Sequence, residues 1–419
     1  MTERARNVLL LGADYGLFLV GLAFASQATI LPAFAAWLGA PNVAIGAIPA
    51  VMTLGWFLPS LFAAGHTEAL ARKLPFIRRW TGWERVPYLV LALFAFFVAD
   101  RAPGLTLAVL LAMLLVSTGV GGLLMPAWMD LIGRAVPTAT RGRFFALWSL
   151  AAGVVSFGAS FVVAAVLARV PAPASYGICF LAASAFLGLS WLALVFVREP
   201  AGGAAAEPVG LRTYLARVPG LLRRDRNLSW FLASRAFALA GTMAAGFYTV
   251  YALRAWDAPA AKAGVFTALL VAGHALGTLT LGWVGDHAGH RLVLLVGMAA
   301  TAAANVVALL APTLTAFEAV FVLTGLQTAA INVSALNVLL EFAPTPAERP
   351  TYIGLGTTSM APVAFAAPLV AGLLADAFGF RVVFVVALVT GMAGLVMLAT
   401  RVRDPRGIAG TRAVEEAPA

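Results

Sequence analysis

Long apolar stretches follow one another along the whole of this 419-residue chain. Hydrophobic residues make up 62% of the sequence and charged residues 11%, which leaves too few polar groups to cover the surface of a water-soluble protein. Most stretches have about the 20 residues that a helix needs to cross a bilayer, and they lack the strict alternation of barrel strands. The sequence therefore predicts an all-α membrane protein.

We expect about twelve transmembrane helices, because the apolar stretches between charges reach that number. The predicted spans lie near residues 8–33, 43–64, 86–100, 104–129, 144–168, 175–197, 228–253, 264–285, 292–312, 315–340, 351–375 and 380–400.

Basic residues alternate between the two sides of the membrane in a way that agrees with this count. If the N-terminus is inside, most arginines, Arg85 among them, fall in predicted cytoplasmic segments. The predicted outer loops hold only Arg101, Arg169, Arg254, Lys262 and Arg381. Because cytoplasmic loops are enriched in Lys and Arg, the pattern predicts a multi-pass protein of the cell inner (cytoplasmic) membrane with both termini in the cytoplasm. It also explains the net charge of +10 without nucleic acid as a partner.

The two halves of the chain carry similar features in the same order. Val197-Arg198-Glu199-Pro200 follows the sixth predicted span, and Val402-Arg403-Asp404-Pro405 follows the twelfth. Asn7 and Asn227 begin the two halves, and glycines recur at matching places in the second and eighth spans. This order indicates a duplicated six-helix unit, an arrangement found in secondary transporters. The predicted organisation is an N-terminal bundle at 1–197, a cytoplasmic linker at 198–227, a C-terminal bundle at 228–400 and a cytoplasmic tail at 401–419.

Residues 282–291 read Gly-Trp-Val-Gly-Asp-His-Ala-Gly-His-Arg and follow the eighth predicted span. They resemble the cytoplasmic loop signature Gly-x-x-x-Asp-x-x-Gly-x-Arg of the major facilitator superfamily. The first-half copy, near Gly65 and Glu68, lacks the aspartate, and the fifth span lacks the Gly-Pro signature of drug–proton antiporters. The resemblance implies two pseudo-symmetric six-helix bundles and a secondary transporter.

The same resemblance implies a cytoplasmic gate. Glycines allow a tight turn, and Asp286 can cap a helix N-terminus while pairing with an arginine. We expect Asp286 near the cytoplasmic end of the eleventh span, within reach of Arg291 or Arg349. The candidate gate residues are Gly282, Asp286, Gly289, Arg291, Asp130, Arg141, Glu341 and Arg349.

Asp14 lies inside the first predicted span, and Arg235 lies at nearly the equivalent place in the seventh. Arg235 is the only basic residue that we place inside a span. Charged side chains in a bilayer are costly and usually face the protein interior with a partner. In the family these two helices line a central cavity from opposite halves, which implies a charge pair or a substrate and proton site. Pairing within its own half, or snorkelling, is the alternative for each residue, and both interpretations stay open.

Other polar residues in the predicted spans are candidates for the same cavity. His274 could carry protons, although such a histidine is more often a hydrogen-bonded packing residue. Gln327, Ser334 and Asn337 can share one helical face. Interhelical hydrogen bonding is the alternative, and the resemblance favours cavity lining because this helix lines the cavity in the family. The full set of these candidates is Gln27, Tyr248, Tyr251, His274, Gln327, Asn332, Ser334 and Asn337.

The leading functional hypothesis is a secondary active transporter that moves a small organic solute by alternating access, with protons as the expected coupling ion. A non-transporting membrane receptor or assembly factor on the same scaffold is the alternative, and an enzyme comes third because no nucleophile–base constellation is present. We expect no cofactor, since no nucleotide-binding glycine loop occurs. We expect no metal site, since the loop signature explains Asp286, His287 and His290. The expected partners are a small-molecule substrate, protons and the lipid bilayer, with the protein acting as a monomer.

Overall fold

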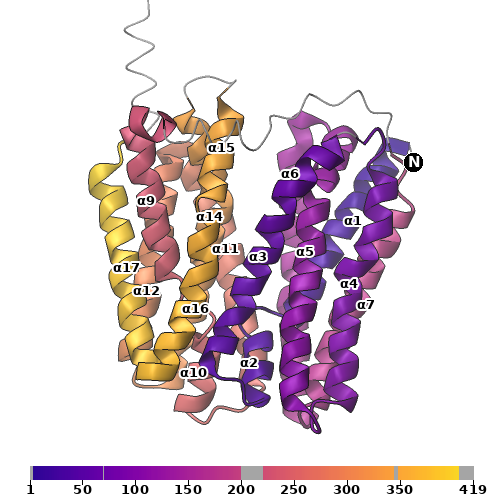
Figure 1. Ribbon diagram of the computed structural model, residues 1–419, viewed down its shortest axis with the longest axis vertical. Coiled ribbons are helices and arrows are strands. Elements are labelled where there is room, and N and C mark those ends of the chain that lie inside the picture. The colour runs from indigo at the N-terminus through magenta and orange to yellow at the C-terminus, as the bar shows by residue number, and fades with distance from the viewer. Residues whose placement is uncertain (1–2, 69, 200–219, 344–347, 405–419) are drawn as a thin grey trace, which may run out of the picture. The chain divides into compact units, whose positions relative to one another are not determined.

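The computed structural model describes residues 3–68, 70–199, 220–343 and 348–404, and these ranges contain helices and turns but no strand (Figure 1). Ten of the helices in these ranges are long and apolar enough to cross a membrane. The remaining two spans are α4 (Leu74–Phe97), whose first half carries several charges, and a segment broken into α9 (Arg226–Gly241) and α10 (Tyr248–Ala255). The fold is thus that of a twelve-span helical membrane protein.

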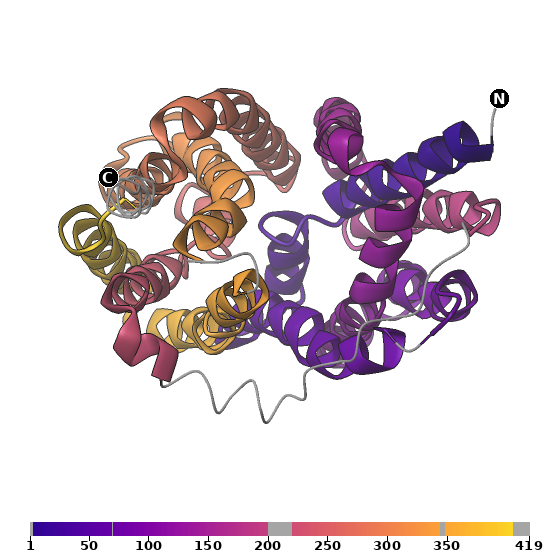
Figure 2. The same cartoon turned by 90° about the horizontal axis from the view of Figure 1, so that it is seen from above.

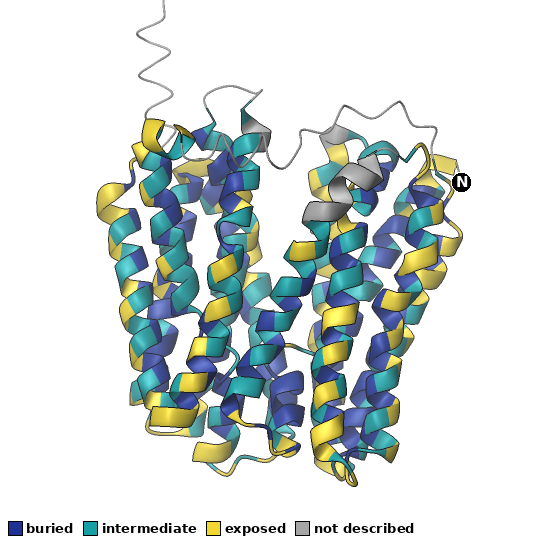
Figure 3. Ribbon diagram, viewed as in Figure 1, coloured by how far each residue is buried: buried dark blue, intermediate teal, exposed yellow. Residues whose placement is uncertain are grey.

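The chain divides into two compact units. The first unit holds residues 1–208 together with 249–268, and the second holds residues 209–248 together with 269–419. Large apolar side chains are exposed in both, such as Phe97 at 69% and Leu310 at 74%. Figure 3 shows exposed positions of all residue types along the helices of each unit. Exposed apolar side chains suit contact with lipid.

In the first unit, α1 packs against α6 and α7, α3 packs against α5, and α4 lies between α5 and α7 (Figure 2). Leu11, Leu131 and Leu194 are buried in its core. The second segment of this unit is fixed by hydrogen bonds, among them one of 2.6 Å between the hydroxyls of Thr29 and Thr267. Besides α4 and α10, its helices are α1 (Glu3–Phe24), α2 (Ile30–Trp37), α3 (Asn42–Glu68), α5 (Pro103–Ala135), α6 (Thr138–Arg169), α7 (Ala174–Val195) and the first turns of α11 (Lys262–Ala288).

In the second unit, α12 packs against α14 and α17, and α17 also contacts α9 and α16. Phe231, Leu294 and Phe342 are buried in its core. Its helices are α9, most of α11, α12 (His290–Leu310), α13 (Leu314–Phe317), α14 (Ala319–Phe342), α15 (Arg349–Thr358), α16 (Ala361–Phe378) and α17 (Phe380–Arg401).

The structure corrects several of the predicted spans, and the eleventh consists of the two helices α15 and α16. The first is two helices, since α1 ends at Phe24 and α2 begins at Ile30, and the seventh is divided in the same way into α9 and α10. The third span begins at Leu74 and not near residue 86. The predicted span is too short because the arginines in the first half of α4 resemble those of a cytoplasmic loop, whereas Arg85 is buried, at 5% exposure.

In each unit an asparagine side chain forms two hydrogen bonds with the backbone of an arginine, and the recurrence of this contact supports the internal repeat. The Asn7 side chain donates to the carbonyl oxygen of Arg198 at 2.6 Å and accepts from the Arg198 backbone N–H at 3.1 Å. The Asn227 side chain makes the same pair of bonds with the backbone of Arg403, at 3.0 and 2.8 Å. Each asparagine thereby fastens the first helix of its half to the chain that leaves the last one. We call these pairs the asparagine clamps.

We expect Asn7→Ala to destabilise the protein by about 1–3 kcal/mol, because two part-buried hydrogen bonds to the backbone of Arg198 would be lost, each worth about 0.5–1.5 kcal/mol. Asn7→Asp should cost at least as much, since the carboxylate oxygen in place of Nδ2 would face the Arg198 carbonyl oxygen and could not donate to it. Asn227→Ala should cost less than Asn7→Ala, because its clamp is exposed whereas Asn7 is 4% exposed. Thermal unfolding of the purified variants in detergent measures the order, and equal midpoints for Asn7→Ala and the wild type would contradict it.

Candidate functional site

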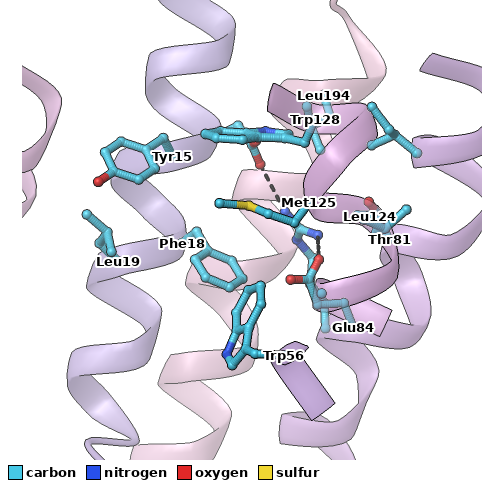
Figure 4. A pocket seen from close by; sticks show the side chains of 14 residues that line it. Tyr15, Phe18, Leu19, Trp56, Thr81, Glu84, Leu124, Met125, Trp128 and Leu194 are labelled. Carbon is cyan, nitrogen blue, oxygen red and sulfur yellow. Dashed lines mark hydrogen bonds and ion pairs between the residues drawn. The ribbon is translucent and has the colours of Figure 1, made fainter. Parts of the chain in front are cut away.

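A cavity of about 140 Å³ lies within the first unit, between helices α1, α3, α4, α5 and α7 (Figure 4). Its walls are mostly aromatic and aliphatic, and its polar groups are concentrated in one buried cluster of charges. The lining residues are Asp14, Tyr15, Phe18, Leu19, Trp56, Ile77, Thr81, Glu84, Arg85, Gly121, Leu124, Met125, Trp128 and Leu194.

Asp14 on α1 is 2% exposed, and donors surround both of its carboxylate oxygens. Oδ1 accepts from Arg85 Nη2 at 2.9 Å and from the Ser190 hydroxyl at 2.6 Å. Oδ2 accepts from Trp128 Nε1 at 2.9 Å. A buried carboxylate needs this degree of compensation to stay ionised. Asp14 is therefore fully satisfied within its own half, which agrees with one of the two interpretations left open by the sequence.

Arg85 on α4 is the centre of the cluster. Its Nη1 donates to Glu84 Oε2 at 2.9 Å, and its Nε donates to the Leu187 carbonyl oxygen at 3.0 Å. The guanidinium carbon also lies 5.6 Å from the centre of the Phe18 ring. The prediction that Arg85 lies in a cytoplasmic segment was wrong, as was the prediction that Arg235 is the only basic residue within a span. The planar fork of donors on Arg85 is satisfied from several sides, which makes its burial tolerable.

Glu84 is 8% exposed and adds a second carboxylate next to the same arginine. Its Oε2 accepts the Arg85 bond, whereas its Oε1 receives no hydrogen bond from any described residue. Gly121 on α5 leaves space beside this oxygen. A Cβ at Gly121 would lie 2.9 Å from Oε1 and 2.9 Å from the Trp56 ring. With both acids ionised, the cluster carries an excess of one negative charge, at Glu84.

A second cavity, of about 110 Å³, lies within the second unit and contains Arg235. Gln327, Thr242 and Thr301 supply its other polar groups. The Arg235 guanidinium carbon is 5.8 Å from the centre of the Phe231 ring, and Nη1 is buried without a hydrogen-bond acceptor among the described residues. The positive charge of Arg235 therefore lies at the wall of this cavity without an anionic partner among the described residues.

Most of the remaining polar candidates on α14 make contacts outside the two cavities. Asn332 Nδ2 lies 3.2 Å from His274 Nε2, so these two residues join α14 to α11. Ser334 is fully buried and lies 3.1 Å from Nδ1 of His290 on α12. The Asn337 side chain donates to the backbone oxygen of Val333 in its own helix. Of the tenth-span residues, Gln327 alone lines either of the two cavities described.

The other three candidates lie in different surroundings. Gln27 is exposed in the turn between α1 and α2. The Tyr248 hydroxyl donates to Asn305 Oδ1 at 3.0 Å, and its ring packs among phenylalanines in the core of the second unit. The Tyr251 ring meets the edge of Trp256, at 5.5 Å between centroids, in the first unit.

Asp286 and Arg291 do not form the expected ion pair in the part of the chain that the structure describes. Asp286 is exposed, and Arg291 donates instead to the Leu398 and Ala399 carbonyl oxygens at the end of α17. Asp130 pairs with Arg134 at 2.6 Å.

Arg141 donates to the Gly133 carbonyl oxygen at 3.0 Å, at the end of α5. Free carbonyls at a helix C-terminus attract such cations, which accounts for both arginine contacts. Gly289 has the left-handed φ of 98° that a turn before α12 requires, and Gly282 lies within α11. Glu341 lies near the end of α14, and the side chain of Arg349 falls outside the described residues.

Glu84, Ser190 and Trp56 were not identified from the sequence. The adjacent Glu84 and Arg85, directly before an apolar run, were the available signal for an extended third helix. No comparable signal pointed to Ser190, because its role depends on the approach of α7 to α1.

Comparison with known proteins gives consistent results. Residues 231–419 match the sequence profile of the Major Facilitator Superfamily. A stretch of 122 residues, 29% of this chain, is 33% identical to the Tetracenomycin C resistance and export protein of Streptomyces glaucescens. The match spans only 22% of that relative's length.

Solved structures resemble the chain over nearly its whole length. A variant of the nucleoside transporter NupG has a TM-score of 0.70 at 14% identity, covering 94% of this chain and 100% of its own. A bacterial homologue of the iron transporter ferroportin, in an inward-facing state, has a TM-score of 0.70 at 14% identity, with coverages of 95% and 98%. The D-xylose-proton symporter reaches 0.66 at 12% identity, with coverages of 96% and 98%. At these identities the likeness shows the fold.

Proposed function

We propose, from the premise that this chain belongs to the major facilitator superfamily, that it is a secondary active transporter of a small organic solute. The chain is a multi-pass membrane protein of a transporter family, and a non-enzymatic transport role follows from that membership. Alternating access between its halves, driven by a proton gradient, is the mechanism that we propose for it.

The observation that supports this proposal best is the charged cluster at the cavity of the first unit. Asp14, Glu84 and Arg85 are all at least nine-tenths buried, on helices otherwise suited to a bilayer. Ionisable groups inside membrane helices are costly and usually mark a substrate or ion pathway. A purely structural membrane bundle could be built more cheaply from apolar residues. Carboxylates at a cavity can also bind and release protons, which coupling requires.

The proposed setting is the cytoplasmic membrane, with the protein acting as a monomer and both termini in the cytoplasm. The proposed orientation rests on the excess of arginine in the predicted cytoplasmic segments over the predicted outer loops. Reporter fusions after Arg401 and after Arg198 should therefore report a cytoplasmic location. An external location for either fusion would contradict the orientation.

Transport is tested with the purified protein in liposomes, by screening small organic solutes with and without a pH gradient. We expect wild-type accumulation of at least one solute to follow the gradient. If Asp14 or Glu84 carries the coupling proton, Asp14→Asn or Glu84→Gln should abolish gradient-driven accumulation while solute exchange continues. Asp100→Asn, which removes an exposed acid, is the matched control. A wild-type protein that moves no solute would favour the receptor or assembly-factor alternative.

A further inference from the structure

One oxygen of the buried Glu84 carboxylate stands apart from the rest of the charged cluster. Both carboxylate oxygens of Asp14 and Oε2 of Glu84 accept hydrogen bonds at 2.6–2.9 Å. Glu84 Oε1 accepts none from the described residues, although the residue is 8% exposed. Because Glu84 lines the cavity, Oε1 can accept a hydrogen bond from a donor that enters it.

Aromatic rings surround the space into which this oxygen is directed. Figure 4 shows Phe18, Trp56 and Trp128 around the cavity that Glu84 faces. The ring of Trp56 and Glu84 Oε1 both lie 2.9 Å from the point where a Cβ on Gly121 would stand, so the ring and the oxygen are neighbours. Aromatic faces attract cations through their quadrupole, in addition to the apolar contact they offer.

Arg85 does not neutralise this site. Its guanidinium is shared between Asp14 and Glu84, and one of its nitrogens is bound to the Leu187 carbonyl oxygen. Asp14 already draws on Arg85, Ser190 and Trp128, so the excess negative charge remains at Glu84. An anionic guest would meet this charge, whereas a cation would balance it.

We infer that the cavity of the first unit binds an organic cation, with its ammonium group beside Glu84 and its apolar or aromatic body against Phe18, Trp56 and Trp128. This inference rests on the proposed transport function and names the substrate class of the same site. The cavity volume of about 140 Å³ is close to the roughly 150 Å³ of an engineered protein cavity that admits benzene. The cavity is therefore of the size of a single ring, with Glu84 on its wall to meet a short ammonium substituent.

Three probes built on one ring test the inference on the purified full-length protein: benzylammonium, benzyl alcohol and benzoate. Isothermal titration calorimetry at neutral pH should show tightest binding for benzylammonium. Glu84→Gln should weaken benzylammonium by about tenfold or more, which corresponds to 1.4 kcal/mol, and leave benzyl alcohol unchanged. Gly121→Ala, which removes no charge but places a methyl group between Oε1 and the Trp56 ring, should weaken both.

Asp100→Asn is the control for general loss of negative charge and should bind like the wild type. Acidification should weaken benzylammonium in the wild type, because protons compete for Glu84, and should have little effect in Glu84→Gln. Absent binding, equal affinity for all three probes, preference for benzoate, or full affinity in Glu84→Gln would overturn the inference.

The proposed transport function is judged separately. If liposomes accumulate a neutral or anionic solute and Glu84→Gln still does so, the cation inference fails while transport stands. If benzylammonium binds through Glu84 but no solute crosses the membrane, the binding site stands and the transport proposal fails.

Discussion

Arg85→Gln is expected to destabilise the protein by about 3–5 kcal/mol, because it leaves two buried carboxylates without their shared cation. Asp14 would keep only Ser190 and Trp128, and Glu84 would keep no charged partner. Asp14→Asn should be far milder, since Arg85 and Glu84 then remain as a balanced pair. The double variant Asp14→Asn/Arg85→Gln should fall between them, because a single carboxylate is then stranded. Thermal unfolding in detergent, followed by loss of monodisperse protein, measures the order.

Two further measurements separate charge from packing. Arg79→Gln removes an exposed arginine from the same helix and should have little effect. Acidification should restore part of the stability of Arg85→Gln, because protonation neutralises the stranded acids. If Arg85→Gln unfolds like the wild type, or is not helped by acid, the cluster does not hold α1 to α4 in the way described here.

The architecture was predictable from the sequence because its signals are local or repeated. Apolar length sets the spans, and the order of small motifs reveals the duplication. The match of Asn7 with Asn227 is confirmed at the level of hydrogen bonds, since each side chain clamps the backbone of the equivalent arginine. Because the clamp has the same structural role in both halves, the same residue type occurs at the equivalent position of each.

The candidate site was only partly predictable, because its partners meet through tertiary contacts. Asp14 was identified as a costly charge in a span, but the burial of Arg85 depends on Asp14, Leu187 and Glu84 from three helices. A basic residue near the end of an apolar run otherwise resembles a cytoplasmic anchor. Counting charges in a linear window cannot distinguish these two situations.

The break between α1 and α2 escaped prediction for a different reason. Neither glycine nor proline marks it, and the apolar pattern continues through it. The chain turns because the Ser26 carbonyl oxygen accepts the backbone N–H groups of both Ile30 and Leu31 at 3.0 Å. Such a turn satisfies the backbone without any change in composition.

Gly122→Ala and Gly325→Ala are expected to disrupt the first and second unit respectively. A Cβ at Gly122 would lie 2.5 Å from the backbone oxygen of Trp56 on α3. A Cβ at Gly325 would lie 2.2 Å from the backbone oxygen of Leu270 on α11. Backbone atoms cannot rotate away as a side chain can, so the helices must separate. Overpacking typically costs about 1–3 kcal/mol and occasionally more, and we expect the upper part of that range.

Gly158→Ala is the matched control, because a Cβ there meets no atom within 4 Å. Alanine is the better helix former by roughly 0.5–1 kcal/mol, so this variant should be as stable as the wild type or slightly more so. The opposite signs exclude a general effect of glycine replacement in α-helices. The two variants also test the internal repeat, because Gly122 lies against Gly55 of α3 in the first unit and Gly325 lies against Gly273 of α11 in the second. Tight glycine contacts of this kind provide helix association in lipid, where the hydrophobic effect between helices is absent. Unchanged unfolding midpoints for Gly122→Ala and Gly325→Ala would show that these helices can move apart at little cost.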